Sequence, residues 1–88
     1  MKSYYFTLTQ FSDLELGHAC DPTDFDGAVD AFAEQMEAGN SSQVFRVDLG
    51  TNATAPMMVD VTNDAIDRVS SRLRQRRMDA PEWLLEAA

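Results

Sequence analysis

The chain has 88 residues, of which 44% are hydrophobic, and its fifteen acidic and seven basic side chains give a net charge of −8. This length allows one domain, and the hydrophobic content excludes intrinsic disorder. The single cysteine, Cys20, excludes an internal disulfide, and no run approaches the ~20 apolar residues of a membrane-spanning helix. The sequence therefore predicts one cytoplasmic domain over residues 1–88, with no signal peptide and no membrane contact.

Charge is segregated along the chain. Residues 1–67 contain twelve acids and two bases, residues 68–77 contain five arginines and no acid, and residues 78–88 contain three acids and no base. Blocks of opposite sign bear on partners and on electrostatic steering rather than on the fold. The acidic and the basic segments are therefore the first candidates for a binding surface.

The first predicted element is a strand over residues 3–9, where two sets of side chains alternate. One face carries Tyr4, Phe6 and Leu8, and the other carries Tyr5, Thr7 and Thr9. Residues 10–21 lack a clear period and contain Gly17, so we expect a loop there with one possible turn of helix.

An amphipathic helix is predicted over residues 22–38. Either Asp21 or Thr23 suits its N-cap, and Gly39-Asn40 is a C-cap signal that ends it. Its apolar stripe recurs at i, i+4, i+7 and i+11 and consists of Phe25, Val29, Phe32 and Met36.

Two strands, over residues 42–49 and 57–61, are separated by a turn-rich segment and predict a β-hairpin. The alternation in the first of them places Phe45, Val47 and Leu49 toward the core. Alternation in the second does the same for Met57, Val59 and Val61.

A second helix is predicted over residues 62–77, with Thr62 as its cap and an i, i+4 ion pair between Asp64 and Arg68. Its acids lie at the N-terminal end and its arginines at the C-terminal end, which suits the helix dipole. Residues 82–87 predict a short last helix that docks Trp83 together with Leu84 or Leu85.

These elements predict an α+β fold. It is a two-layer sandwich in the order β-α-β-β-α, with a three-stranded sheet, two helices on one face and a short C-terminal helix. The sheet face away from the helices would carry Tyr5, Thr7, Thr9, Val44, Arg46, Asp48, Met58 and Asp60. Such a mixture is typical of a modest protein–protein contact, although scattered apolar surface residues are also normal.

The predicted helix over residues 22–38 has an acidic helix face, which we name as a candidate partner-binding site: Asp24, Asp26, Asp30, Glu34 and Glu37. Steps of three or four residues place these carboxylates ~5–6 Å apart along the axis, comparable to the charge spacing of a nucleic-acid strand. A partner that holds phosphates with Lys and Arg could hold this face instead. The alternative is a solvated face that keeps a small protein soluble.

The second candidate is an arginine cluster that forms an alternative basic site: Arg68, Arg72, Arg74, Arg76 and Arg77. Like charges at i, i+4 repel, so an anion should offset them. This anion is either nucleic-acid phosphate or the acidic helix face of the same molecule or of a neighbour. The net charge of −8 and the absence of interleaved aromatic residues argue against direct nucleic-acid binding.

His18, Cys20 and Asp21 are of the right types to bind a metal, but their spacing fits neither a structural nor a catalytic zinc site. We expect no metal and no other cofactor. The chain also lacks a glycine-rich phosphate loop and the common nucleophile and metalloprotease motifs, so we expect no enzymatic activity.

In size, charge and layout, the whole chain resembles the small acidic inhibitors made by phages and mobile elements, such as anti-CRISPR and anti-restriction proteins. The resemblance is carried by no residue motif. It implies a non-enzymatic DNA mimic that blocks a host nucleic-acid-handling complex by steric and electrostatic means.

Two other functions are compatible with the sequence. One is a nucleic-acid-binding regulator that uses the arginine cluster. The other is a self-associating assembly protein that pairs its two charge blocks or adds strands at a sheet edge. A monomer or a weak homodimer is expected.

Overall fold

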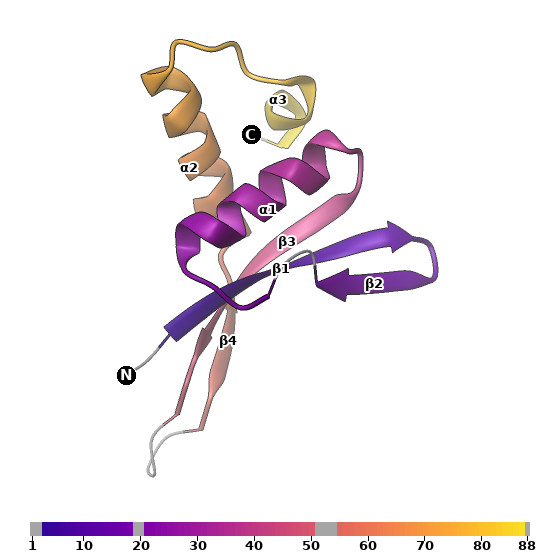
Figure 1. The fold of residues 1–88 in the computed structure, drawn as a ribbon, viewed down its shortest axis with the longest axis vertical. Helices are drawn as coiled ribbons and strands as arrows, with labels where there is room; N and C mark the ends of the chain where they lie inside the picture. Colours follow the sequence, from indigo (N-terminus) through magenta and orange to yellow (C-terminus); the bar gives the residue numbers. More distant parts are fainter. Residues whose placement is uncertain (1–2, 19–20, 51–54, 88) are drawn as a thin grey trace.

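The computed structural model describes residues 3–18, 21–50 and 55–87, and it has the predicted α+β fold (Figure 1). Within these ranges the order is β-β-α-β-β-α-α. The elements are β1 (Ser3–Ser12), β2 (Glu15–His18), α1 (Phe25–Glu37), β3 (Ser41–Asp48), β4 (Met57–Asp60), α2 (Thr62–Gln75) and α3 (Glu82–Ala87). The sheet has four strands, so the prediction of three was wrong. No helix in these ranges is long and apolar enough to cross a membrane.

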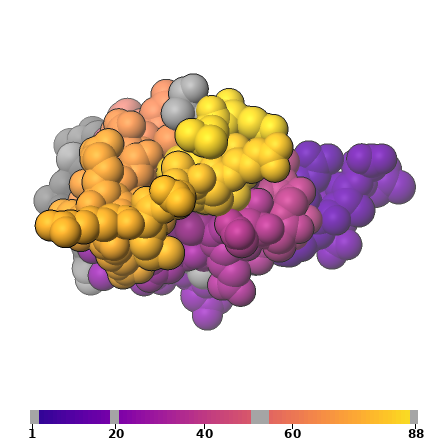
Figure 2. Space-filling model, turned by 90° about the horizontal axis from the view of Figure 1, so that it is seen from above, coloured from indigo at the N-terminus to yellow at the C-terminus, as the bar shows by residue number. Residues whose placement is uncertain are grey.

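The additional strand is β2, which forms a hairpin with β1 where a loop was predicted. All neighbouring strands are antiparallel, in the order β2-β1-β3-β4. Gly17 does not break the strand: a Cβ atom at this position would lie 3.2 Å from Cε2 of Phe11, so the glycine makes room for the ring. Figure 2 shows the indigo and violet β1–β2 hairpin projecting beyond the helices.

α1 lies across one face of the sheet, and α2 and α3 lie toward the upper end of the view (Figure 1). α1 packs on β1 and β3, α2 packs beside α1, and α3 packs on α2. The resulting core consists of Ala28, Val29, Phe32, Val44, Val61, Ala65, Val69 and Leu84. The predicted docking of the last helix is confirmed, because Leu84 is buried and the ring of Trp83 meets Phe32 edge-on at 5.8 Å.

The ends of α1 agree with the sequence except at the N-cap. The cap is Asp24, whose Oδ1 accepts a hydrogen bond from the Gly27 backbone N–H at 2.8 Å, so the prediction of Asp21 or Thr23 was wrong. At the other end Gly39 has φ +87°, which fits the predicted C-cap signal because glycine adopts this region without strain.

The start of α2 also differs from the prediction. Thr62 lies in the first turn and not at the cap, which is Val61. Asp60 Oδ1 accepts hydrogen bonds from the Thr62 backbone N–H at 2.8 Å and from its hydroxyl at 2.6 Å. The carboxylate of the preceding strand therefore satisfies the donors that the predicted Thr62 cap was meant to satisfy.

The helices cover the sheet face that the sequence pattern placed outside. Tyr5 packs against the core, and Thr7, Thr9 and Val44 are buried beneath the helices. Arg46 lies on the same side, because it lines a groove with Tyr5 and α2 residues. The prediction that Tyr5, Thr7, Thr9, Val44, Arg46 and Asp48 face away from the helices was wrong, whereas Met58 and Asp60 do face away.

Hydrogen bonding explains how this more polar face is buried. The Thr7 hydroxyl donates to the Ala28 carbonyl oxygen of α1 at 2.7 Å, and the hydroxyls of Thr9 and Ser42 lie 3.0 Å apart. Because these side chains are short and their hydroxyls are hydrogen-bonded, α1 packs close to the sheet and the cost of removing the hydroxyls from water is offset. Phe45 and Val47, which the pattern placed inside, point to the opposite face.

Candidate partner-binding surfaces

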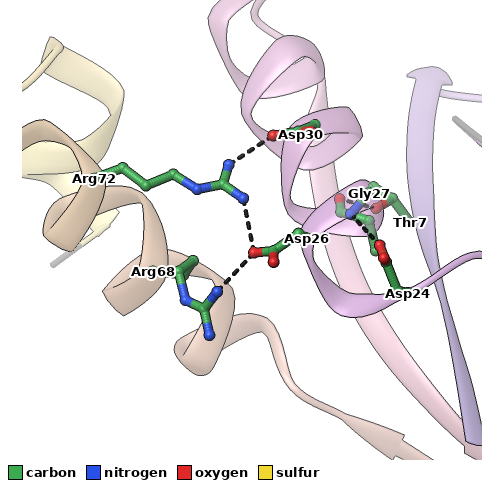
Figure 3. A network of polar contacts seen from close by, with 8 residues as sticks. Thr7, Asp24, Asp26, Gly27, Asp30, Arg68 and Arg72 are labelled. Atoms are coloured by element: carbon green, nitrogen blue, oxygen red, sulfur yellow. Dashed lines mark hydrogen bonds and ion pairs between the residues drawn. The ribbon is translucent and has the colours of Figure 1, made fainter.

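The acidic helix face and the arginine cluster meet within one molecule (Figure 3). Arg72 donates from Nη1 to Asp30 Oδ1 at 2.6 Å and from Nη2 to Asp26 Oδ1 at 2.9 Å. Arg68 Nη1 donates to the same Asp26 oxygen at 2.6 Å. The two aspartates are one helical turn apart on α1, and the two arginines are one helical turn apart on α2. The opposite charges of the two helices therefore lie side by side.

The predicted ion pair between Asp64 and Arg68 is absent from the ion pairs of the described residues. Arg68 turns toward α1 instead, where its guanidinium carbon lies 5.0 Å from the centre of the Phe25 ring. A cation over an aromatic face adds attraction to the ion pair with Asp26. Tertiary packing thus overrides the local i, i+4 pairing.

The two neighbouring carboxylates favour the charged form of Arg72. Burial alone would lower the pKa of Arg72, but its hydrogen bonds to Asp30 and Asp26, and their charges, raise that pKa above the ordinary value. The side chains of Asp26 and Asp30 remain 59% and 71% exposed, so each pair contributes only about 0.2–1 kcal/mol to stability. The network orients α1 and α2 more than it stabilises them.

The rest of each candidate site lies outside this network. On α1, Asp24 caps its own helix and Glu37 accepts a hydrogen bond from Trp83 Nε1 at 2.9 Å. Glu34 is exposed and has no ion pair in the described part of the chain. On α2, Arg74 and the following Arg76 and Arg77 likewise form no ion pair with any described residue.

An open groove of about 640 Å³ runs between the start of α1 and α2. Arg46, Arg68 and Arg74 line it together with Asp64 and Asp67. Because both signs of charge line this open groove, it favours neither a phosphate nor a metal cation.

No group of three metal-ligating side chains gathers in residues 3–18, 21–50 and 55–87. His18 lies on β2 with its ring centre 4.9 Å from that of Phe6. Cys20 lies outside the described residues, so its geometry with His18 stays a prediction.

The sequence pattern assigned to the core a set of apolar side chains that the helices leave uncovered. We call the face that carries them the open sheet face; its apolar and aromatic side chains are Tyr4, Phe6, Leu8, Leu16, His18, Phe45, Val47 and Met58, and the polar side chains among them are Gln10, Ser41, Gln43 and Asp60. The strand register places these side chains opposite one another, with the rings of Phe6 and Phe45 stacked at 5.5 Å. The strand register reveals this face, because residues paired across two strands lie on the same side of the sheet. Val47 pairs with Met58, and so neither lies on the side of the helix-facing Val59.

Comparison with protein-family models, with curated proteins and with solved structures gives no significant match. Any argument about function therefore starts from the surfaces described above.

Proposed function

We propose that this protein is a non-enzymatic inhibitor that occupies the basic, nucleic-acid-binding surface of a partner complex, in the manner of anti-CRISPR and anti-restriction DNA mimics. The observation that carries the proposal is the charge left after internal pairing. The ion pairs of the described residues join three arginines to three aspartates, so they cancel equal charge of both signs and the net charge of −8 stays with the other side chains. A field of this sign attracts a groove lined with Lys and Arg.

The internal ion pairs also order the carboxylates. Asp26 and Asp30 use their Oδ1 atoms for Arg68 and Arg72, and their Oδ2 atoms make no hydrogen bond within the described residues. These exposed oxygens can accept hydrogen bonds from a partner without further loss of side-chain entropy. In this proposal, Arg68 and Arg72 are positioning residues for the acidic helix face.

Glu34→Lys tests the proposal with the least structural disturbance, because Glu34 is exposed and unpaired within the described residues. Reversing its charge should weaken partner binding about tenfold, since one charged contact is worth about 1.4 kcal/mol. Asp13→Lys, at the exposed β1–β2 turn, makes the same charge change away from α1 and should have less than about a twofold effect.

The measurement is capture of a nucleic-acid-binding complex on the tagged protein, followed by displacement with duplex DNA and a binding titration of each variant. Equal losses for Glu34→Lys and Asp13→Lys would reduce the effect to net charge and overturn a specific acidic site. Retention of nucleic acid itself, abolished by replacing Arg74, Arg76 and Arg77 with Ala, would favour the basic regulator instead.

A further inference from the structure

The open sheet face is the side of the sheet opposite the one on which α1 packs. Its two ends are the most exposed: Met58 on β4 is 63% exposed and Leu16 on β2 is 66% exposed. Between them, the ring of Phe6 stacks on Phe45 and meets His18 at a tilt, and Phe6 itself is only 9% exposed because its neighbours cover it. A sheet of this kind usually has its apolar face covered by a second layer.

The charge on this face restricts what can cover it. The chain has fifteen acids, and the strand register places Asp60 on this face. The carboxylate of Asp60 already accepts hydrogen bonds from Gln43 and Thr62. The face therefore offers almost nothing to a basic partner, in contrast with α1. Its complement is a second surface with few charges and several apolar side chains, which the same face of another copy provides.

The size of the face suits a second copy of the chain. Strands of ten, four, eight and four residues, with a rise of ~3.4 Å per residue and a spacing of ~4.8 Å, cover about 400 Å² in projection. Two such faces in contact total about 800 Å², which is below the ~1,200 Å² of stable specific interfaces and in the range of weak, transient ones, so the expected dimer is weak.

Other routes to self-association are partly closed. Both edge strands have only four residues. The free edge of β1 is occupied where Tyr5 exchanges backbone hydrogen bonds with Thr23, and the edge of β3 is occupied where the Val44 carbonyl accepts from the Val61 N–H. Short and covered edges disfavour strand addition, and the charge blocks already pair within one molecule.

We propose that two copies of this chain pack face to face through the open sheet face, with the helices on the outside of a two-sheet sandwich. Sheets packed in this way lie ~10 Å apart and interdigitate their side chains. Each copy would bury the exposed side chains of Leu16 and Met58 and the partly exposed ring of Phe45. The acidic helix faces would stay exposed on the outer surfaces of the dimer.

Sedimentation velocity between about 10 and about 500 µM tests this, since a small interface is expected to be half-occupied in the micromolar range. The native chain should approach twice its mass of 9.8 kDa as concentration rises. Met58→Glu should raise the dissociation constant at least about tenfold, because each copy then brings a charge into the interface. The matched control is Met57→Glu, which changes the neighbouring residue on the other face, where Met57 is 59% exposed, and should leave the dimer intact.

Leu16→Glu provides a second variant at the opposite edge, and circular dichroism checks that each variant is folded. A native chain that stays monomeric over the whole range overturns the proposal. So does a dimer that both methionine variants weaken equally, or one that neither Met58→Glu nor Leu16→Glu weakens. Glu34→Lys should leave the dimer intact, which separates this inference from the proposed function.

Discussion

Val44→Asp is expected to unfold the protein, whereas Val47→Asp should leave it folded. Val44 is fully buried beneath the helices, and Val47 lies on the open sheet face. An unpaired charge at a buried position costs several kcal/mol, comparable to the whole stability of a small domain. At position 47 the carboxylate reaches water, and the loss should be about 1 kcal/mol of strand preference.

Urea unfolding followed by circular dichroism measures the free energy of unfolding of both variants. Each variant is the control for the other, because both replace a valine of β3 with aspartate. If Val47→Asp unfolded the chain and Val44→Asp did not, the helices would cover the opposite face. Sedimentation of Val47→Asp adds a second readout, because a charge on the open sheet face should also keep the chain monomeric.

Phe32→Ala should lower the free energy of unfolding by about 3–5 kcal/mol, the usual cost of removing a buried aromatic ring. Phe32 is buried at the centre of the core, where it contacts α3 through the edge of Trp83. The substitution would therefore leave a cavity and release the last helix. Urea unfolding gives the stability, and Trp83 fluorescence reports the environment of α3.

Leu85→Ala is the control for this second prediction, because Leu85 also lies on α3 but is exposed. Its effect should stay within about 0.5 kcal/mol. A loss of less than about 1 kcal/mol for Phe32→Ala would mean that the core is not centred on this ring.

Local signals predicted the helices and β1 well. The position of α1 was predicted from an apolar stripe, Phe25, Val29, Phe32 and Met36, and from the glycine after it. The buried face of a helix is visible in its own sequence as a period of 3.6 residues. Gly17 misled the prediction of β2, since the reason for that glycine is contact with the Phe11 ring. A glycine in a strand and a glycine in a turn look alike in a sequence.

The faces of the sheet could not be derived from the pattern alone. Both faces of β1 and β3 contain residues suited to a core, and a shift of one residue exchanges them. The Thr7–Ala28 hydrogen bond and the register of Val47 with Met58 decide between the faces, and both join distant segments. The hydrogen bonds from Arg68 and Arg72 to α1 join residues 42 to 46 positions apart, so the sequence alone could not identify the anion that pairs with the arginine cluster.

The most direct test of this fold is a set of nuclear Overhauser contacts between α1 and the sheet. The Thr7 hydroxyl lies 2.7 Å from the Ala28 carbonyl oxygen, and Val44 packs in the same core as Val29. Contacts from the methyl groups of Thr7 and Val44 to α1, with none from the rings of Phe6 or Phe45, are the expected result. Contacts from those rings to α1 would place the helices on the opposite face and remove the open sheet face from the molecule.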